Sequence, residues 1–212
     1  MKRPLPPTFA RGTIAPVAEL PRAPWRSGGR RGLGHTGARS GLAALEFALT
    51  APILSALFIG SVDTAQLFMG QLKLSSAVFA GADYALVNAS EANSTSGAGL
   101  ANSIAAIVGN VNGAGWASGT VVVNNGTTAT FSGGNIATTP ATSNANLFYC
   151  LTGSPGAWVW GAGQATSTSC GTNEAAPGKF VTISATTTVT PLITGMSFTT
   201  GTISQSVAVQ VQ

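Results

Sequence analysis

A single carboxylate interrupts the most apolar stretch of the sequence. Glu46 is the fifth residue of a run from Leu42 to Val62 that is otherwise dominated by Ala, Leu, Ile and Phe, and Arg39 and Gly41 stand just before it. A charged side chain at the centre of a bilayer costs about 3 kcal/mol or more, so it is usually retained for a partner or a function. Glu46 could pair with a positive charge, or it could interact with the positive end of its own helix, which is worth ~0.3–1 kcal/mol.

The other residues offer little for catalysis. His35 is the only histidine and precedes Gly41, so no Ser-His-Asp or Cys-His arrangement can form in the part that follows. Asp63 and Asp83 are 20 positions apart, which is ~30 Å along a straight helix and too far for a shared carboxylate site. We therefore expect no catalytic residues, no cofactor and no metal, because two cysteines without a histidine also cannot complete a zinc site.

Basic residues are concentrated before Gly41. Eight of the ten Lys and Arg residues lie there beside one acid, Glu19, so this stretch carries about +7 and the remainder is near −3. The net charge of +4 therefore does not indicate a nucleic-acid partner. Basic residues ahead of an apolar span mark the cytoplasmic side of a membrane, which predicts a cytoplasmic N-terminus. Residues 1–41, rich in Pro, Gly and Arg, are interpreted as a targeting leader.

The apolar run is long enough to cross a bilayer, which takes ~20 helical residues. Pro52 lies inside it and is expected to bend the helix. The helical pattern continues to about Asn88, which gives a rod of roughly 70 Å that must project well beyond the membrane. One apolar stripe is predicted along this extension: Phe68, Leu72, Phe79, Ala82 and Leu86. Three glycines either provide notches for helix packing or merely weaken the rod: Gly60, Gly70 and Gly81.

The outer part of the chain changes composition towards Ala, Gly, Ser, Thr and Asn. Apolar residues at helical spacing predict a short helix: Leu100, Ile104, Ile107, Val108 and Val111. Strands are predicted at 120–123, 181–186 and 205–211, with a Gly-rich loop at 132–135. Alternating apolar and polar residues favour an antiparallel sheet with one wet face. The predicted fold class is α+β, a long N-terminal transmembrane and amphipathic helix followed by a small antiparallel β-rich extracytoplasmic domain.

These observations divide the chain into five predicted segments. They are a leader at 1–41, a transmembrane helix at 42–62 and a helix extension at 63–90, then a loop with a short helix at 91–118 and a β-rich domain at 119–212.

Both cysteines, Cys150 and Cys170, lie in the predicted β-rich domain. An even cysteine count in an exported domain favours a disulfide. Closing a loop of about 20 residues stabilises the fold by ~3 kcal/mol in the chain-entropy model. Trp158 and Trp160 lie within this loop and would face the same side of a strand, either packed on a small core or exposed as an adhesive surface.

One stretch, from Gly41 to Phe47, resembles the processing site of the Tad (tight adherence, Flp-type) pilins, in which glycine precedes cleavage and an aromatic residue follows the glutamate. The longer segment from Ala44 to Ala85 resembles the TadE/TadG-like family of minor pilins, or pseudopilins. The positions that carry this resemblance include Glu46, Phe47, Gly60, Asp63, Gln71, Ala77, Gly81, Ala82 and Tyr84. The end of the chain is similar to the C-terminal part of that family's outer domain. This similarity covers Val181 to Ser184, Thr190-Pro191-Leu192 and Ile203 to Val211.

The resemblance implies a structural subunit that contributes to pilus assembly and surface adhesion. A prepilin peptidase would cut between Gly41 and Leu42 on the cytoplasmic side, and the new Leu42 amine of one subunit could pair with Glu46 of another. Implied partners are other major and minor pilins, the Tad assembly platform and membrane lipid, with no nucleic acid. The implied location is the bacterial inner membrane, with the C-terminus periplasmic, and then the pilus or cell surface.

Two other functions fit the same residues. The chain could be a single-pass envelope protein that keeps its leader and never enters a filament. It could also be a secreted glycan-binding or hydrolytic domain behind an unusual signal.

Overall fold

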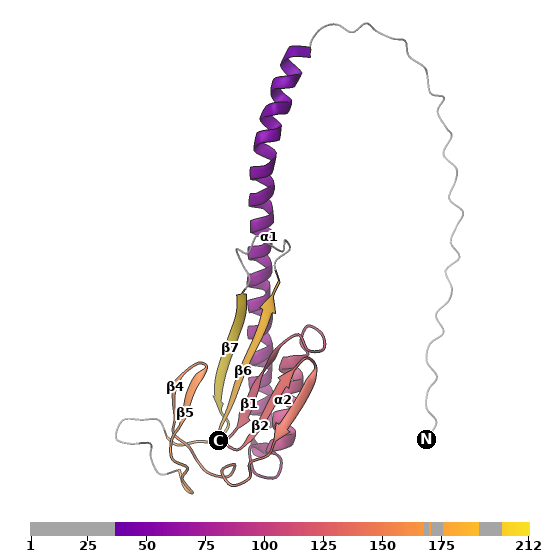
Figure 1. Ribbon diagram of the computed structural model, residues 1–212. Coiled ribbons are helices and arrows are strands. Elements are labelled where there is room, and N and C mark those ends of the chain that lie inside the picture. The colour runs from indigo at the N-terminus through magenta and orange to yellow at the C-terminus, as the bar shows by residue number, and fades with distance from the viewer. Residues whose placement is uncertain (1–36, 168–169, 171–175, 191–200) are drawn as a thin grey trace, which may run out of the picture. The chain divides into compact units, whose positions relative to one another are not determined.

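The computed structural model describes residues 37–167, 170, 176–190 and 201–212, and the fold is α+β. Its helices are α1 (Gly37–Val87), the 3-10 helix η1 (Ala89–Glu91) and α2 (Gly97–Gly109) (Figure 1). Its strands are β1 (Ser118–Val123), β2 (Thr127–Ser132), β3 (Asn135–Thr139), β4 (Leu151–Ser154), β5 (Ala157–Trp160), β6 (Phe180–Val189) and β7 (Gly201–Gln210). The chain divides into the units Met1–Leu45 and Glu46–Gln212, and all strands belong to the second. The predicted leader up to residue 36, and Pro191 and Leu192 of the predicted C-terminal similarity, lie outside the described residues.

Helix α1 is continuous over 51 residues. It confirms the long helix predicted from Leu42 to about Asn88, and its Ala and Leu content favours this conformation. The helix begins earlier than expected, at Gly37, so the predicted cleavage position after Gly41 lies within it. Pro52 is accommodated inside α1, and the bend expected there stays a prediction.

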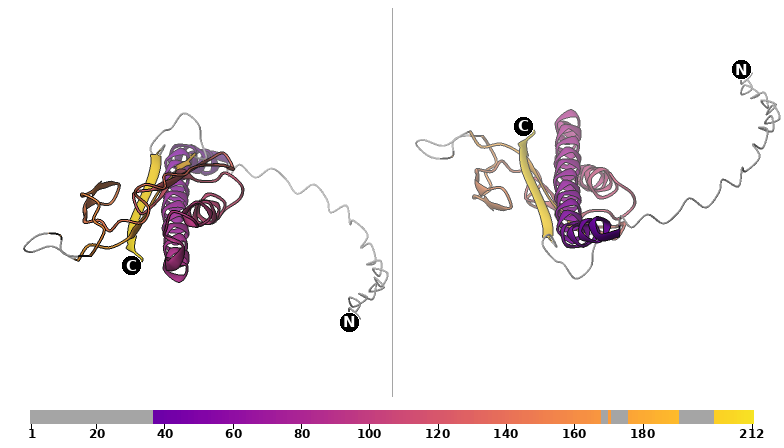
Figure 2. Two further views of the ribbon diagram at one scale, coloured as in Figure 1. Left: turned by 90° about the horizontal axis from the view of Figure 1, so that it is seen from below. Right: turned by 90° about the horizontal axis from the view of Figure 1, so that it is seen from above.

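Five strands form one antiparallel sheet in the order β3-β2-β1-β6-β7. Val121 of β1 pairs with Ile183 of β6, which pairs with Val207 of β7, and the first two are fully buried. The neighbouring pair, Thr120 and Ser184, lies on the other face because successive side chains of a strand point to opposite sides. Helices α1 and α2 cover the apolar face, and the β4–β5 hairpin lies on the opposite side (Figure 2). The expected antiparallel sheet with one wet face is confirmed.

The Gly-rich segment 132–135 is a tight hairpin turn and not the long loop that was expected. Ser132 pairs with Asn135 in the β2–β3 ladder, so only Gly133 and Gly134 connect the strands. Their φ angles of 56° and 82° are those that a two-residue hairpin turn of type I′ requires, and glycine adopts them without steric cost. Strands β2 and β3 escaped prediction because their polar residues alternate mostly with small ones, which leaves a weak apolar signal.

The core lies between the helices and the apolar face of the sheet. Its fully buried side chains include Leu74, Ala77 and Val78 of α1, Leu100, Ile104 and Val108 of α2, and Val121, Val123, Val181 and Ile183 of the sheet. Helix α2 confirms the predicted short amphipathic helix. Val111 is the exception, because it lies beyond the end of α2 and is 47% exposed.

The stripe predicted along α1 is not the face that packs. Of its five positions only Ala82 is buried, whereas Phe68, Leu72, Phe79 and Leu86 are 49–68% exposed. The buried face is made instead of Leu74, Ala77, Val78, Gly81, Ala82 and Ala85. Small residues let the helix backbone approach its neighbours closely, and this explains why the face with smaller side chains is the buried one.

Candidate functional site

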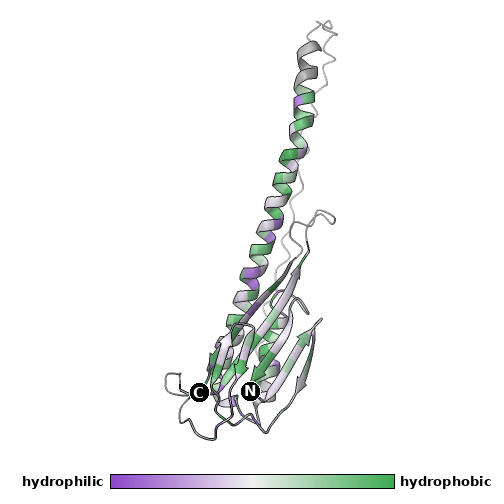
Figure 3. Cartoon of the chain, turned by 60° about the vertical axis from the view of Figure 1, so that its left-hand side comes forward, coloured by the Kyte–Doolittle hydropathy of each residue, from purple (hydrophilic) through white to green (hydrophobic). Residues whose placement is uncertain are grey.

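The first half of α1 leaves its large apolar side chains without cover from the rest of the described chain. Leu45, Phe47, Leu57 and Phe58 are 65–71% exposed. From Ala43 on, the helix is long and apolar enough to cross a membrane, and the most apolar part of it is not buried. Figure 3 shows hydrophobic residues on successive turns there, ahead of the part of α1 that packs on the sheet. Exposed apolar surface of this extent marks contact with lipid or with other protein, and it suggests membrane anchoring.

Glu46 lies on this exposed apolar segment. Its side chain is exposed, and within the described part of the chain it forms no ion pair or side-chain hydrogen bond. The neighbouring Leu45 and Phe47 are equally exposed, so Glu46 is a carboxylate surrounded by apolar surface. A carboxylate in such surroundings requires a partner from outside the described residues or water.

Hydroxyl groups in the same segment are satisfied by the helix itself. Thr50 donates to the carbonyl of Glu46 at 3.0 Å, Ser61 to that of Phe58 at 2.7 Å, and Thr64 to that of Gly60 at 2.7 Å. Such bonds to the preceding turn let Ser and Thr enter an apolar environment without an unpaired donor. Glu46 has no comparable internal bond, which separates it from these three residues.

The three glycines of α1 beyond Gly41 have different surroundings. A Cβ at Gly81 would lie 2.9 Å from Val108 Cγ2 and 3.1 Å from Ile104 Cγ2, and one at Gly70 would lie 3.2 Å from Ile203 Cδ1. Gly70 and Gly81 are thus packing notches for the protein's own domain. Gly60 has no atom within 4 Å of a built Cβ, and it lies in an open apolar concavity with Pro52, Ala56, Leu57 and Thr64.

The acids of α1 differ in burial. Glu46 and Asp83 are exposed, whereas Asp63 is only 7% exposed. A role for Asp63 at the outer boundary between membrane and water stays a prediction. Its low exposure distinguishes it from the other two acids of this helix. Within the described ranges, no three His, Cys, Asp or Glu side chains lie close enough to hold a metal ion.

The predicted disulfide is confirmed. Cys150 and Cys170 are bonded, with Cα atoms 5.5 Å apart and a sequence separation of 20. Trp158 and Trp160 lie on the same side of β5 and are half-buried, and the choice between a packed and an adhesive role stays a prediction. Trp160 packs edge-on against Tyr149 with ring centroids 5.5 Å apart.

The outer face of the sheet carries a set of hydroxyl groups that the sequence did not predict as neighbours. Thr120 of β1, Ser184 of β6 and Ser206 of β7 are paired across three strands, and Thr186 pairs with Ser204 one step along. The available signal was the Ser and Thr content of the polar positions in 181–186 and 205–211. That signal did not predict which of these residues would become neighbours, because strand register was unknown.

Comparison with known proteins finds a family similarity along most of α1. The family model described as TadE-like protein matches residues 41–83, about a fifth of the chain. No curated protein and no solved structure matches the chain. The matched range begins at Gly41, includes Glu46, and ends at Asp83 on the part of α1 that packs on the sheet. The similarity at the end of the chain lies outside this range and stays a prediction. The match over residues 41–83 identifies this segment as similar to the TadE-like proteins, a family associated with the Tad pilus, and it supports membership of that family.

Proposed function

We propose that the protein is a minor pilin, or pseudopilin, of a Tad pilus and acts as a structural subunit in pilus assembly and surface adhesion. The observation that carries this proposal is the exposed Glu46 carboxylate. It lies five positions after Gly41, on an uncovered apolar helix that matches the TadE-like family. A protein that worked alone in the membrane would gain nothing from an unpaired acid at that place.

In this proposal a prepilin peptidase cuts between Gly41 and Leu42 on the cytoplasmic side. Because α1 already begins at Gly37, the first turns of the helix must open before an extended backbone can enter a protease cleft. Glycine makes this opening easier, since it is ~1 kcal/mol less favourable than alanine in a helix. The cut leaves a positive amine at Leu42 and removes the basic leader.

Assembly then gives Glu46 a partner in another subunit. We assign this role to the Leu42 amine of a neighbouring pilin, with Phe47 packed beside the pair. An unpaired charge buried in an apolar bundle costs several kcal/mol. The axial register that brings the two charges together is therefore favoured over the other registers. Other major and minor pilins, the Tad assembly platform and membrane lipid are the partners.

A weaker role for Glu46 is to stabilise its own helix. Carboxylates near a helix N-terminus contribute ~0.3–1 kcal/mol, and the effect declines beyond the first turn. With Leu42 as the first residue of the mature chain, Glu46 is already at the fifth position. The dipole interaction is therefore too small to offset the cost of placing the acid in an apolar environment.

The charge distribution supports the orientation that we propose. The basic stretch before Gly41 remains in the cytoplasm until cleavage, and the disulfide-bonded domain is periplasmic. The subunit then leaves the inner membrane for the pilus or the cell surface.

One structural feature favours a second candidate, an envelope protein that keeps its leader. Helix α1 runs unbroken through the proposed cleavage position from Gly37, as an uncleaved anchor would. The intact mass of the membrane-extracted protein separates the two candidates, because cleavage after Gly41 removes 41 residues.

The test combines N-terminal sequencing with two matched charge removals on α1. Glu46→Gln removes the acid from the apolar segment, and Asp83→Asn removes an exposed acid from the part that packs on the sheet. We expect mature protein beginning at Leu42 in both variants, and loss of pili from Glu46→Gln alone.

Each failure has its own meaning. A mature chain that begins elsewhere would remove the pilin assignment. Normal pili from Glu46→Gln would leave the assignment in place and remove the charge pair. Equal loss of pili from both variants would show that net charge matters and that the position of Glu46 does not.

A further inference from the structure

The outer face of the sheet carries hydroxyl groups in register on three adjacent strands. We call these residues the hydroxyl face: Thr120 of β1, Ser184 and Thr186 of β6, and Ser204 and Ser206 of β7. Thr120 pairs with Ser184, which pairs with Ser206, and Thr186 pairs with Ser204. Neighbouring strands lie ~4.8 Å apart and alternate residues along a strand ~6.8 Å apart. The hydroxyl face is therefore a regular grid and not a random polar surface.

Part of this grid has unused hydrogen-bonding capacity. Ser184 donates to Ser206 at 3.3 Å, and Thr186 donates to the carbonyl of Ser118 at 3.2 Å. Within the described residues, the hydroxyls of Thr120 and Ser204 form no hydrogen bond. A hydroxyl both donates and accepts, so the grid can bind a ligand that offers both kinds of group.

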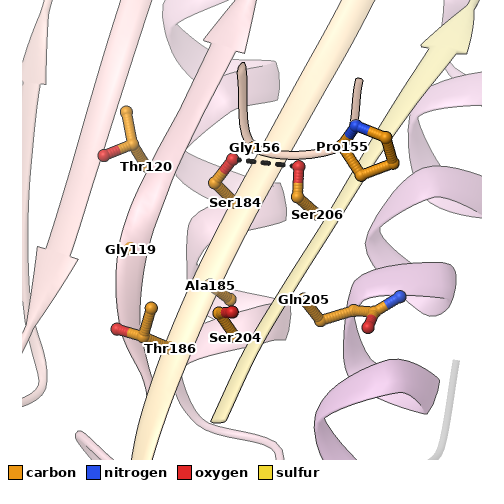
Figure 4. A pocket seen from close by; sticks show the side chains of 10 residues that line it. All are labelled: Gly119, Thr120, Pro155, Gly156, Ser184, Ala185, Thr186, Ser204, Gln205 and Ser206. Carbon is orange, nitrogen blue, oxygen red and sulfur yellow. Dashed lines mark hydrogen bonds between the residues drawn. The ribbon is translucent and has the colours of Figure 1, made fainter. Parts of the chain in front are cut away.

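A second element turns the face into a cleft. The tip of the β4–β5 hairpin, Pro155 and Gly156, lies beside the Ser184–Ser206 pair, and the space between them measures about 550 Å³ (Figure 4). Cavities that bind small molecules have volumes of about 300–1,000 Å³. Gln205 also borders the cleft, but its side chain points away from the hydroxyl face (Figure 4).

The hairpin is fixed at its base, so the cleft does not depend on a free loop. Tyr149, just before β4, forms two backbone hydrogen bonds with Gly178, of 2.8 and 3.0 Å. Trp160 of β5 packs against the Tyr149 ring, and the Cys150–Cys170 disulfide ties the same segment to a later part of the chain. A wall held at several points is pre-organised, which lowers the entropy cost of binding.

None of the described residues that border the cleft is charged, and this selects the ligand. The lining consists of hydroxyl-bearing residues, small residues, Pro155 and Gln205. An anionic or cationic ligand would lose its hydration without meeting an opposite charge. A neutral ligand with many hydroxyl groups would exchange its water contacts for the grid, and the ring of Pro155 offers an apolar surface to one face of a sugar.

We infer that this cleft binds a neutral oligosaccharide chain. The inference gives the adhesive role proposed above a ligand class and rests on that proposal for its biological setting. Binding itself is a property of the folded outer domain and can be measured independently of cleavage or assembly.

The test uses the full chain in lipid nanodiscs, because sugar-based detergents would compete for the cleft. The neutral probes are cellohexaose, maltohexaose and chitohexaose, and hexagalacturonate is the anionic comparison. Binding is followed by saturation-transfer NMR and calorimetry. We expect at least one neutral probe to bind and hexagalacturonate not to bind.

The variants locate the site. Thr120→Val combined with Ser206→Ala removes two hydroxyls from the cleft, and the expected loss is at least tenfold in affinity. Thr202→Val is the matched control, because Thr202 is an exposed hydroxyl residue of the same strand, β7, outside the cleft. It should change affinity less than twofold. Thermal unfolding checks that each variant is folded, and Ser206→Ala alone replaces the double variant if that one is not.

Three results would overturn the inference: no binding of any neutral probe, equal loss in the Thr202→Val control, or binding of hexagalacturonate alone. These outcomes are separable from failure of the pilus assignment. Mature protein that begins at Leu42 and binds no sugar contradicts the oligosaccharide inference only. Uncleaved protein that binds a neutral probe contradicts the pilin assignment only.

Discussion

Substitution of Gly81 by alanine tests how closely α1 approaches its own domain. A Cβ at Gly81 would lie 2.9 Å from Val108 Cγ2, 3.1 Å from Ile104 Cγ2 and 3.2 Å from Ile183 Cδ1. Carbon atoms in good contact are ~3.5–4.0 Å apart, so the new methyl group is too close to three atoms at once. Those three side chains are fully buried, and Val and Ile are stiff at χ1.

Two opposing effects determine how much Gly81→Ala changes the free energy of unfolding. Alanine is ~1 kcal/mol more favourable than glycine in a helix interior, whereas overpacking a core typically costs ~1–3 kcal/mol. Three simultaneous close contacts with stiff neighbours favour the upper part of that range. We therefore expect Gly81→Ala to lower the free energy of unfolding by about 1–2 kcal/mol, which corresponds to a fall in Tm of about 3–6 °C for a protein of this size.

The assay is thermal unfolding of the detergent-solubilised full chain, followed by far-ultraviolet circular dichroism. Gly60→Ala is the matched control, because it is the same change on the same helix with no atom within 4 Å. It should leave Tm unchanged or raise it slightly. A second variant removes one of the crowding side chains. Val108→Ala combined with Gly81→Ala should lower the free energy of unfolding by less than the sum of the two single changes, because the effects of neighbouring sites are not additive.

One result would refute this reasoning. If Gly81→Ala were as stable as the unchanged protein, or more stable, the close approach of α1 to α2 and β6 would be wrong. Gly81 would then be only a weak point in the helix, which is the alternative that the sequence left open.

Three further predictions concern the outer domain. Replacing both Cys150 and Cys170 by serine should lower the free energy of unfolding by about 3 kcal/mol, because the loop of 20 residues is no longer closed; an unchanged urea midpoint under non-reducing conditions would contradict this. Asn124→Ala should lower the free energy of unfolding by about 2–4 kcal/mol in the same urea titration, because the buried side-chain amide donates to the carbonyls of two other residues at 2.8 Å. The control is Asn102→Ala at an exposed position of α2, which should lower it by less than about 1 kcal/mol. Burial raises the pKa of Tyr149, against a smaller lowering by a hydrogen bond with a neighbouring Asn side chain. The folded state therefore holds this proton more tightly than the unfolded state, and stability should fall as pH rises above about 10. The stability of the Tyr149→Phe variant should fall less steeply over the same pH range. Identical pH profiles for the two proteins would contradict this prediction.

Several features followed from the sequence because they depend on local composition and spacing. A membrane-length apolar helix, one acid within it and a basic stretch before it can be recognised without knowing any contact. The same holds for the alternation of β6 and β7, which reflects the two faces of a strand. Cys150 and Cys170 were the only cysteines, so their pairing required no choice. The match over residues 41–83 falls on this locally coded part of the chain.

Other features required the tertiary structure. The buried face of α1 is the one with Ala and Gly, and the larger residues Phe68, Leu72 and Phe79 remain exposed. Helical periodicity shows that stripes exist, but it does not show which stripe the sheet will approach, since that depends on the shape of the opposing surface.

Strand register was the second thing that the sequence left open. It brings Thr120, Ser184 and Ser206 into one row although they are far apart in the chain. It also reduces the segment 132–135 to a two-residue turn. A shift of one residue would move each of these side chains to the other face. Local sequence therefore determined which elements form, and the pairing between distant strands decided which side chains meet.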